Sequence, residues 1–370
     1  MKLVAQTAPY IRKPVSVKRM MMDVIIALIP VVLFACFQNG WSGVYVILIS
    51  VGTMLVAELI AHALIKWPKE MKFKELFTKN GFLKLKSQYT INNITAPMIS
   101  ALIYALIMPA GCNWYVVLIG ALFGIVIGKM VFGGLGSNIF NPAATGRVFV
   151  GVCFGSKLVY GKGGVDVVSS STPLAQIKGN LGNIVEVLNN YSLQDLFLGN
   201  IPGCMGEVSA LLILVGAVYL FIRRSADLRA CLSMVLSFAA MTLTVSLVAG
   251  GIAKVNAFDV FMFEMLSGGL LFGAVFMITD PVTSPTTKFG RIVFGTMAGA
   301  ITALIRYCGA YPEGVAFSIL IANMVAPTLD TLMRGKANEY NWKQLVGLAA
   351  TMVILCLIVG FAVAGQLGGL

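Results

Sequence analysis

Charged side chains are scarce in this sequence. Of its 370 residues, 11% are Asp, Glu, Lys or Arg and 58% are hydrophobic, whereas soluble globular domains carry about 25% charged residues. The shortage excludes an ordinary soluble domain and indicates an integral membrane protein. The net charge of +12 is explained by membrane topology, as described below, and we expect no nucleic acid as a partner.

Histidine and closely spaced cysteines are lacking as well. His62 is the only histidine, which excludes haem ligation by two histidines of this chain. A single histidine on an apolar helix is more often packed and hydrogen-bonded than functional. No two of the seven cysteines have a C-x-x-C or similar ligand spacing. We therefore expect no iron–sulfur or zinc site built by this chain alone.

Long apolar segments are abundant. A helix needs about 20 apolar residues to cross a bilayer, and candidate segments lie near 21–38, 43–65, 91–110, 114–132, 139–155, 206–222, 228–250, 257–279, 290–307, 313–333 and 344–366. The shorter ones, above all 139–155, fit half-helices equally well, because irregular backbone is tolerated at membrane depth where it lines a buried site. The pattern predicts an all-α polytopic protein with ten or eleven transmembrane helices.

Basic residues gather in one predicted loop. Seven lysines lie from Lys66 to Lys86, and cytoplasmic loops are the ones enriched in Lys and Arg. The loop 66–90 is therefore predicted to be cytoplasmic, either solvated near anionic headgroups or docked to a soluble partner. Counting the crossings from there places the segment 156–205 outside. The polar first 20 residues lead directly into a full-length span, so no cleavable signal peptide is expected.

Two stretches of the chain resemble each other. Residues 117–134 and 292–309 align at a constant offset that superimposes three glycines of each stretch. Five spans per half would give the halves opposite orientations, the inverted-repeat plan in which sites lie near the midplane at broken helices. Glycines every fourth residue also simply allow close helix packing. We divide the chain into a membrane repeat 1–155, an extracytoplasmic loop 156–205, a second repeat 206–333 and an additional helix 334–370.

The glycine-rich stretch "FGGLGSNIFNPAATGR" (132–147) is unsuited to a lipid-facing helix. Its glycines let backbone approach a flat ligand closely, and its amides would be costly if unpaired in hydrocarbon. A polar-edged aromatic ligand would satisfy these groups, and so would neighbouring helices at a structural helix break. The candidate ligand-binding residues are Gly133, Gly134, Gly136, Asn138 and Asn141.

Ionisable residues in or at the edges of spans are costly and are often functional. They are Asp23, Glu58, Lys129, Arg147, Asp259, Glu264, Arg306 and Asp330. Glu58 is the deepest carboxylate, and it either belongs to an ion path or pairs with Lys129 or an arginine. Asp280, followed by a run of hydroxyl side chains, is a second candidate for a cation path, because hard oxygen ligands suit a small cation. The alternative for Asp280 is a capped cytoplasmic turn.

Hydroxyl side chains also fill the stretch "GGVDVVSSSTPLAQIKGN" (163–180). Thr172 precedes Pro173 and a short apolar turn. A threonine followed by proline is the preferred start of a helix, with Thr at the N-cap and Pro at the first position. This local role accounts for Thr172 and Pro173 but leaves the preceding polar residues unexplained.

Four separated motifs carry a family resemblance. Residues 166–172, D-V-V-S-S-S-T, are similar to the D-x-x-S-G-A-T signature at which a flavin transferase attaches FMN, with Ser170 and Ser171 in place of Gly and Ala. The sequence as a whole resembles the D subunits of the Rnf ion-translocating oxidoreductases, and more distantly the B subunits of the sodium-pumping NADH:quinone oxidoreductases. The other motifs are "PYIRKPVSVKRMMMDVIIALIP" (9–30), "FGGLGSNIFNPAATGR" (132–147) and "MITDPVTSPTT" (277–287).

The resemblance implies two flavins. Thr172 would carry FMN through a phosphoester, and Asp166, Ser169 and Ser171 would belong to the flavinylation motif that the transferase reads. A second flavin, riboflavin, would bind without a covalent bond in the membrane part, for which the stretch 133–141 is the candidate. The urea-channel-like fold of the family would place Thr172 on the outer face of a bacterial cytoplasmic (inner) membrane.

The resemblance also implies a function. The chain would relay electrons across the membrane as one subunit of a ferredoxin:NAD+ oxidoreductase that drives Na+ or H+ transport, and it would not be catalytically complete alone. Its partners would be iron–sulfur subunits, a second FMN-bearing subunit and the flavin transferase. The alternatives are a flavin-free channel or transporter of the same fold, and the B subunit of the quinone reductase. The extra apolar segment 342–365 departs from the family pattern and suggests a peripheral assembly helix.

Overall fold

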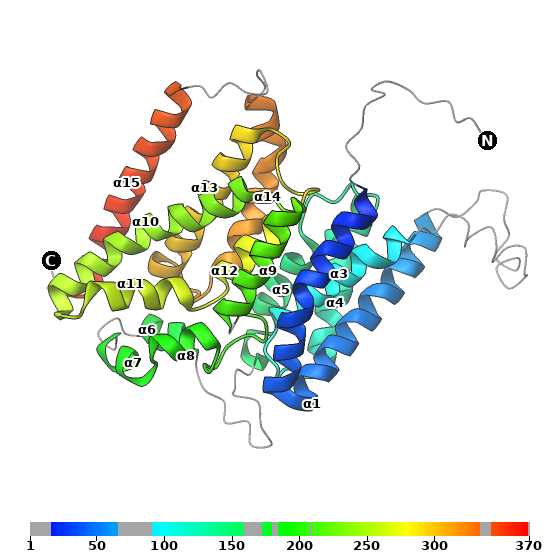
Figure 1. The fold of residues 1–370 in the computed structure, drawn as a ribbon, viewed down its shortest axis with the longest axis horizontal. Helices are drawn as coiled ribbons and strands as arrows, with labels where there is room; N and C mark the ends of the chain where they lie inside the picture. The colour runs from blue at the N-terminus through cyan, green and yellow to red at the C-terminus, as the bar shows by residue number, and fades with distance from the viewer. Residues whose placement is uncertain are drawn as a thin grey trace, which may run out of the picture.

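The computed structural model describes residues 16–65, 91–158, 172–179, 184–207, 209–333 and 342–368. Every regular element in these ranges is helical (Figure 1). The loop 66–90 and three residues of the flavinylation motif, Asp166, Ser169 and Ser171, lie outside them. The prediction of an all-α polytopic protein is confirmed.

A hairpin of two helices, labelled together as α1, opens the described chain. Helix α1 (Val17–Ile65) contains 49 residues and two of the predicted spans, and it bends at Gly40, whose φ of 55° lies in the left-handed region. Both ends of α1 lie toward the top of Figure 1 and its bend lies at the bottom. At the bend, Gln38 Nε2 donates to the carbonyl of Gly199, at 2.7 Å. The segment that follows Thr172 therefore lies at the same end of the molecule as the bend.

The first half of the membrane part is completed by three short helices. Against α1 pack α3 (Asn92–Leu106) and α4 (Trp114–Gly128), and α4 in turn packs on α5 (Pro142–Cys153). The 3-10 helix η2 (Met130–Phe132) connects α4 to the turn before α5. His62 lies on α1 within hydrogen-bonding distance of Asn93, at 3.2 Å, so it is packed and hydrogen-bonded as expected.

Small helices form a separate layer at the end of the molecule that holds the α1 bend (Figure 1). They are α6 (Pro173–Gly179), α7 (Ile184–Asn190) and α8 (Leu193–Leu198), and the 3-10 helix η3 (Gly155–Lys157) follows directly after α5. Their apolar side chains, including Leu174, Ile177 and Leu196, form a second buried cluster with Val260 and Phe263 of α11. The layer is thereby fixed to the membrane part rather than attached by a loose loop.

The second half contains the longest straight helices. Its elements are α9 (Ala210–Arg223), α10 (Leu228–Ala253), α11 (Ala257–Leu266), α12 (Leu270–Phe272), the π-helix η5 (Gly273–Met277), α13 (Lys288–Cys308), α14 (Val315–Leu332) and α15 (Trp342–Gln366). Helix α10 packs along α13 and α15. Arg306 of α13 stabilises the break after α11, where its Nη1 donates to the carbonyl of Glu264, at 2.7 Å, and to the Glu264 carboxylate, at 3.0 Å.

All eleven predicted apolar segments coincide with helices, but fewer are complete spans. Among the described residues, six helices are long and apolar enough to cross a membrane, and a seventh span results if the pair bent by 52° between α11 and α12 counts as one. The number is lower because α1 is counted once, although it consists of two helices that meet at Gly40 and contain two predicted spans, and because α3, α5 and α9 contain 15, 12 and 14 residues. The inverted repeat stays a prediction.

Candidate functional site

Two cavities hold five of the candidate residues: Gly136, Asn138, Asn141, Thr172 and Asp280. One, which we call the asparagine cavity, has a volume of about 510 Å³ and is lined by Asn138, Asn141, Asp280 and apolar residues of α1, α3 and η5. The other, the threonine cavity, has a volume of about 400 Å³ and is lined by Thr172, Arg147, Glu207, Tyr311 and Glu313. Both volumes lie within the range of about 300–1,000 Å³ that small-molecule sites occupy.

Asn141 joins the two halves of the molecule at the asparagine cavity. Its Oδ1 accepts hydrogen bonds from the backbone N–H groups of Ala143, at 3.0 Å, and Ala144, at 3.4 Å, so it caps α5. Its Nδ2 donates to the carbonyl of Met277 in η5, at 3.3 Å. One amide therefore serves both as a helix cap and as a link between α5 and the π-helix.

The predicted glycine and asparagine set is only partly brought together. Gly136, Asn138 and Asn141 line the cavity, whereas Gly133 and Gly134 do not. The φ values of Gly133 and Gly134, 111° and 87°, permit the tight turn that ends η2, a backbone path that side chains with a Cβ rarely adopt. These two glycines shape the turn, and the residues after it line the cavity.

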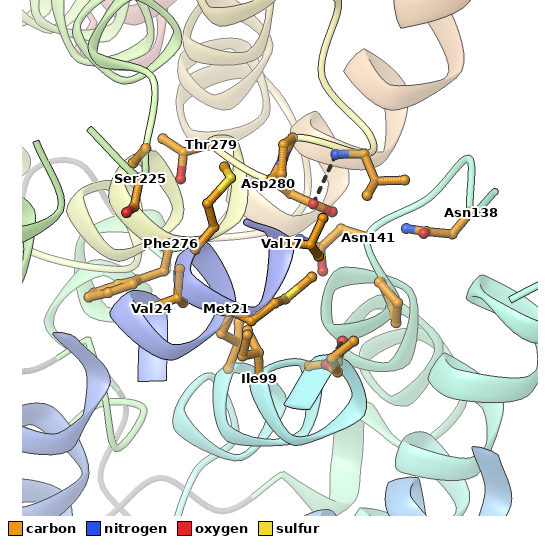
Figure 2. Close-up of a pocket in the computed structure, with 18 of the residues that line it drawn as sticks. Val17, Met21, Val24, Ile99, Asn138, Asn141, Ser225, Phe276, Thr279 and Asp280 are labelled. Carbon is orange, nitrogen blue, oxygen red and sulfur yellow. Dashed lines mark hydrogen bonds between the residues drawn. The ribbon is translucent and has the colours of Figure 1, made fainter. Parts of the chain in front are cut away.

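Asp280 lies beside Asn141 in the asparagine cavity (Figure 2). Its carboxylate accepts from the N–H of Val282, at 3.1 Å, and from the hydroxyl of Thr283, at 3.3 Å. The expected capped turn and the cavity position thus occur together. Burial raises the pKa of Asp280, although the two hydrogen bonds act in the opposite direction.

Glu58 is held in an ion pair. Lys129 Nζ lies 2.6 Å from Glu58 Oε2, and both side chains are only 3% exposed. Lys129 also lines the asparagine cavity and interacts electrostatically with Asp280. Of the two interpretations of Glu58, the structure supports the ion pair with Lys129. The charge of Lys129 also connects Glu58 electrostatically with Asp280.

The apolar part of the asparagine cavity includes Met21, Val24, Ile99 and Phe276. Figure 2 shows Val24 and Phe276 to one side of the polar ends of Asp280 and Asn141, while the side chain of Met21 extends toward Asn141. Apolar walls with a few convergent polar groups are typical of sites for small organic molecules. The arrangement fits a flat, uncharged ring system with hydrogen-bonding edges.

Thr172 begins a helix, as its sequence context predicts. Its Oγ1 accepts from the backbone N–H of Ala175, at 3.3 Å, and Pro173 is the first residue of α6. Thr172 is 6% exposed, and it lines the threonine cavity. The local N-cap role is therefore confirmed, and the hydroxyl lies at the wall of a cavity large enough for an organic ligand.

Three ionisable residues meet Thr172 in this cavity: Arg147, Glu207 and Glu313. Arg147 is among the ionisable residues predicted to lie in or near spans, but the sequence assigns no site to it. Glu207 and Glu313 were missed, although they lie at the starts of the predicted segments 206–222 and 313–333. Burial, and next the carboxylate of Glu313, raises the pKa of Glu207 well above its usual range. Their positions in the breaks just before α9 and α14 were the only available signal.

A thin partition separates the two cavities. Asn141 lines the asparagine cavity and Met277 lines the threonine cavity, yet the two residues are hydrogen-bonded at 3.3 Å. Helix α5 runs from one cavity to the other, with its cap at the first and Arg147 at the second. Its 12 residues correspond to a length of about 18 Å at about 1.5 Å per residue.

Sequence comparison identifies the family to which this chain belongs. The sequence model of the NQR2, RnfD, RnfE family matches residues 4–339. The chain is 33% identical over 335 residues to the D subunit of the proton-translocating ferredoxin:NAD(+) oxidoreductase complex of Clostridium ljungdahlii, a match that covers 88% of this chain and 92% of that protein. It is 30% identical to the Na(+)-translocating counterpart of Acetobacterium woodii, covering 89% of this chain and 93% of the relative.

A further relative belongs to another kind of complex. The B subunit of the Na(+)-translocating NADH-quinone reductase of Chromohalobacter salexigens is 40% identical over 237 residues, but the match covers 63% of this chain and 56% of the relative. The matches to the two D subunits are lower in identity and extend over nearly the whole of both chains.

Proposed function

The chain belongs to the NQR2, RnfD, RnfE family, and from this premise we propose that it is the D subunit, embedded in the membrane, of an ion-translocating ferredoxin:NAD+ oxidoreductase of the Rnf type. Its role is to relay electrons across a bacterial inner membrane within a complex that moves Na+ or H+. The reach of the match over both chains supports the D subunit, since the B subunit of the quinone reductase matches over 56% of its own length.

The observation that carries this proposal is the pair of cavities on opposite sides of the α5 and η5 partition. Two separate ligand-sized volumes, separated by the partition at which Asn141 donates to the carbonyl of Met277, suit two redox groups that exchange electrons. Within one chain they would form a path between the cavities. A flavin-free channel has no need of two ligand-sized volumes that meet at a single hydrogen bond.

We place covalent FMN at Thr172, with the phosphorus joined to Oγ1 and the ring in the threonine cavity. The residues fit the group, because the cavity has a volume of about 400 Å³ and contains Arg147, a cation suited to a phosphate. The linkage replaces the cap bond to Ala175, a loss of about 1 kcal/mol of helix stability. When bound, flavins supply electron transfer in steps of one or two; the protein supplies position and electrostatics.

Non-covalent riboflavin is assigned to the asparagine cavity. The polar groups of Asn138, Asn141 and Asp280 would bind the ring edges, and Phe276 with the methionines of α1 would contact its faces. The charges of Lys129 and Glu58 neutralise each other, which suits a ligand without a phosphate.

The remaining assignments follow from the family. The loop that ends at Thr172 faces the outer side, where a flavin transferase reads Asp166, Ser169 and Ser171, residues outside those the structure describes. The partners are iron–sulfur subunits and a second FMN-bearing subunit of the complex. Helix α15, whose membrane-spanning stretch is only 11% buried, has its surface available for lipid or for one of these subunits.

In-gel fluorescence tests the covalent flavin. The full chain is co-expressed with a flavin transferase and run on a denaturing gel, which removes any non-covalent flavin. We expect a fluorescent band from the parent chain and complete loss of that band in Thr172→Val, because the phosphoester needs a hydroxyl.

The matched control is Ser192→Ala, which removes the N-cap of α8, where Ser192 Oγ accepts from Asp195 N at 3.1 Å, and leaves Thr172 intact. This variant should keep the fluorescent band. An unmodified threonine in the parent chain by mass spectrometry would contradict the assignment and favour a non-redox channel.

A further inference from the structure

A third group of side chains lies beside Thr172, and two of its members, Glu207 and Glu313, also line the threonine cavity. The Sγ of Cys204 and one carboxylate oxygen each of Glu207 and Glu313 lie within 4.8 Å of one another. Cys204 and Glu207 are brought to one side by a turn in which the N–H of Glu207 donates to the carbonyl of Cys204, at 3.2 Å. Glu313 comes from the break before α14, 106 residues further on in numbering.

These groups surround a cavity about the size of one water molecule or one metal ion. A cavity of about 10 Å³ is lined by Cys204, Glu207, Glu313, Ser267 and Thr172, and a single water molecule needs about 10–15 Å³ of such volume. Ser267 is 1% exposed, and among the residues that the structure describes its hydroxyl has no hydrogen-bond partner. A buried hydroxyl without a partner is costly, so its position on this cavity indicates a ligand.

The fold leaves room for the carboxylates here. A Cβ on Gly269 would lie 2.4 Å from Glu207 Oε1, so only glycine lets the carboxylate approach the break between α11 and α12. Arg147 Nη2 lies 4.0 Å from Cys204 Sγ, where it would stabilise a thiolate. The cluster is thus packed against backbone on one side and against a cation on the other.

We propose that Cys204, Glu207 and Glu313 bind one divalent transition-metal ion of the Zn2+ class. A thiolate with two carboxylates is a ligand set that Zn2+ accepts, completed by a fourth ligand in tetrahedral geometry; a water hydrogen-bonded to Ser267 Oγ takes that position. Alkali and alkaline-earth ions prefer oxygen ligands alone. Binding displaces the thiol proton to solvent, and the ion offsets two carboxylates that would otherwise repel each other.

The ion would act as a structural pin. It joins the segment before α9, the break after α11 and the segment before α14, and all three meet at the wall of the cavity that contains Thr172. From the sequence, no zinc site is expected, because C-x-x-C-type spacing is absent from this chain. That expectation considers only closely spaced ligands, whereas these three ligands come from two distant segments. The proposal holds whether or not Thr172 carries a flavin.

Metal analysis of the full purified chain tests the proposal. The chain is prepared without a polyhistidine tag, incubated with ZnCl₂, freed of loosely bound metal by gel filtration and measured by mass spectrometry of the elements. We expect about one zinc per parent chain and at least a tenfold loss in Cys204→Ser and in Glu207→Gln. Cys231→Ser, at another buried cysteine, and Glu186→Gln, at an exposed glutamate, should retain the metal.

A second readout protects against misfolding of the variants. Co2+ in place of Zn2+ should give a thiolate charge-transfer absorption in the parent chain and in Cys231→Ser, and none in Cys204→Ser, with all three eluting as the same monodisperse peak. Zinc below one tenth per parent chain, or equal zinc in all variants, overturns the proposal. The cluster would in that case be two carboxyl groups that share a proton.

Discussion

The two large cavities differ in charge more than in size. The asparagine cavity is lined mainly by apolar residues, and its cation Lys129 is paired with Glu58 at 2.6 Å. The threonine cavity brings a cation, Arg147, and two carboxylates, Glu207 and Glu313, to one wall. The two cavities therefore offer a ligand different electrostatic environments, one mainly apolar and one with charges of both signs.

The same contrast appears in how each cavity is built. The asparagine cavity lies between elements that begin or end there, with Asn141 capping α5 and Asp280 capping a turn. The threonine cavity lies against the small helices that follow the first half of the membrane part, with Thr172 as the cap of α6. In both cavities, a side chain that caps a helix is also one that we propose to contact or carry the ligand: Asn141 in the first cavity and Thr172 in the second.

The largest expected effect comes from breaking the charge balance of the asparagine cavity. Lys129→Met leaves the carboxylate of Glu58 buried and unpaired, and removal of one partner of a buried ion pair typically costs about 3–5 kcal/mol. We expect a loss of that size in the free energy of unfolding, measured in detergent with a chemical denaturant.

The control for this change is Lys18→Met, which removes a lysine at the exposed start of α1 and should alter stability by less than about 0.5 kcal/mol. The double variant Lys129→Met with Glu58→Leu should recover most of the loss, because it leaves no unpaired charge. Equal stability of Lys129→Met and Lys18→Met would show that the cavity is hydrated and that the pair contributes little.

An intermediate effect is expected from the partition between the cavities. A Cβ on Gly146 of α5 would lie 2.6 Å from the carbonyl oxygen of Gly120 in α4 and 3.1 Å from Tyr104 Cε2. Backbone must shift to accommodate it, so Gly146→Ala should destabilise the chain by about 1–3 kcal/mol. The measurement is the same denaturant unfolding, together with the content of non-covalent flavin.

Gly151→Ala on the same helix is the matched comparison. Its Cβ would meet only Arg147 Nη1, at 3.7 Å, and alanine is the better helix former by about 1 kcal/mol. We expect this variant to be as stable as the parent or more stable. If both alanines behaved alike, close contact between α4 and α5 would not be what holds the partition.

The helices, their caps and the membrane class could be predicted from the sequence because these features depend on residues that are neighbours in the chain. Thr172 followed by Pro173 predicts a helix start, and the apolar segments predict every helix that crosses. The division of residues 17–65 into two spans also agrees with the structure, because α1 consists of two helices that meet at Gly40.

The ionisable residues of the threonine cavity could not be predicted in the same way. Glu207 and Glu313 lie 106 residues apart in numbering, at the starts of two different predicted apolar segments. Only the packing of α9 and α14 brings them to Thr172. Contact between distant segments is a tertiary property, and neither spacing nor composition contains it for a single sequence.

The smallest expected effect is a change in pH dependence at Asp280. Burial in the asparagine cavity raises the pKa of this carboxyl from its ordinary value of 3.8, so the folded protein holds the proton over a pH range in which the unfolded chain has lost it. Stability therefore falls as the pH rises from the unfolded value to the raised folded value. Asp280→Asn retains an oxygen that accepts from Val282 N, at 3.1 Å in the parent chain, and removes the titration.

We expect the melting temperature of the parent chain to fall relative to Asp280→Asn between about pH 4 and the raised value, and the difference to be constant above it. The change should be small, because Asp280 is only partly buried and its carboxylate is hydrogen-bonded. Asp330, an acceptor for the N–H of Thr286 at 2.9 Å, provides the comparison through Asp330→Asn. If the melting-temperature difference falls equally for Asp280→Asn and Asp330→Asn, its origin lies outside the asparagine cavity. If it falls only for Asp280→Asn, Asp280 is the titrating group, and the asparagine cavity differs from the threonine cavity in having a single charge without an ion-pair partner.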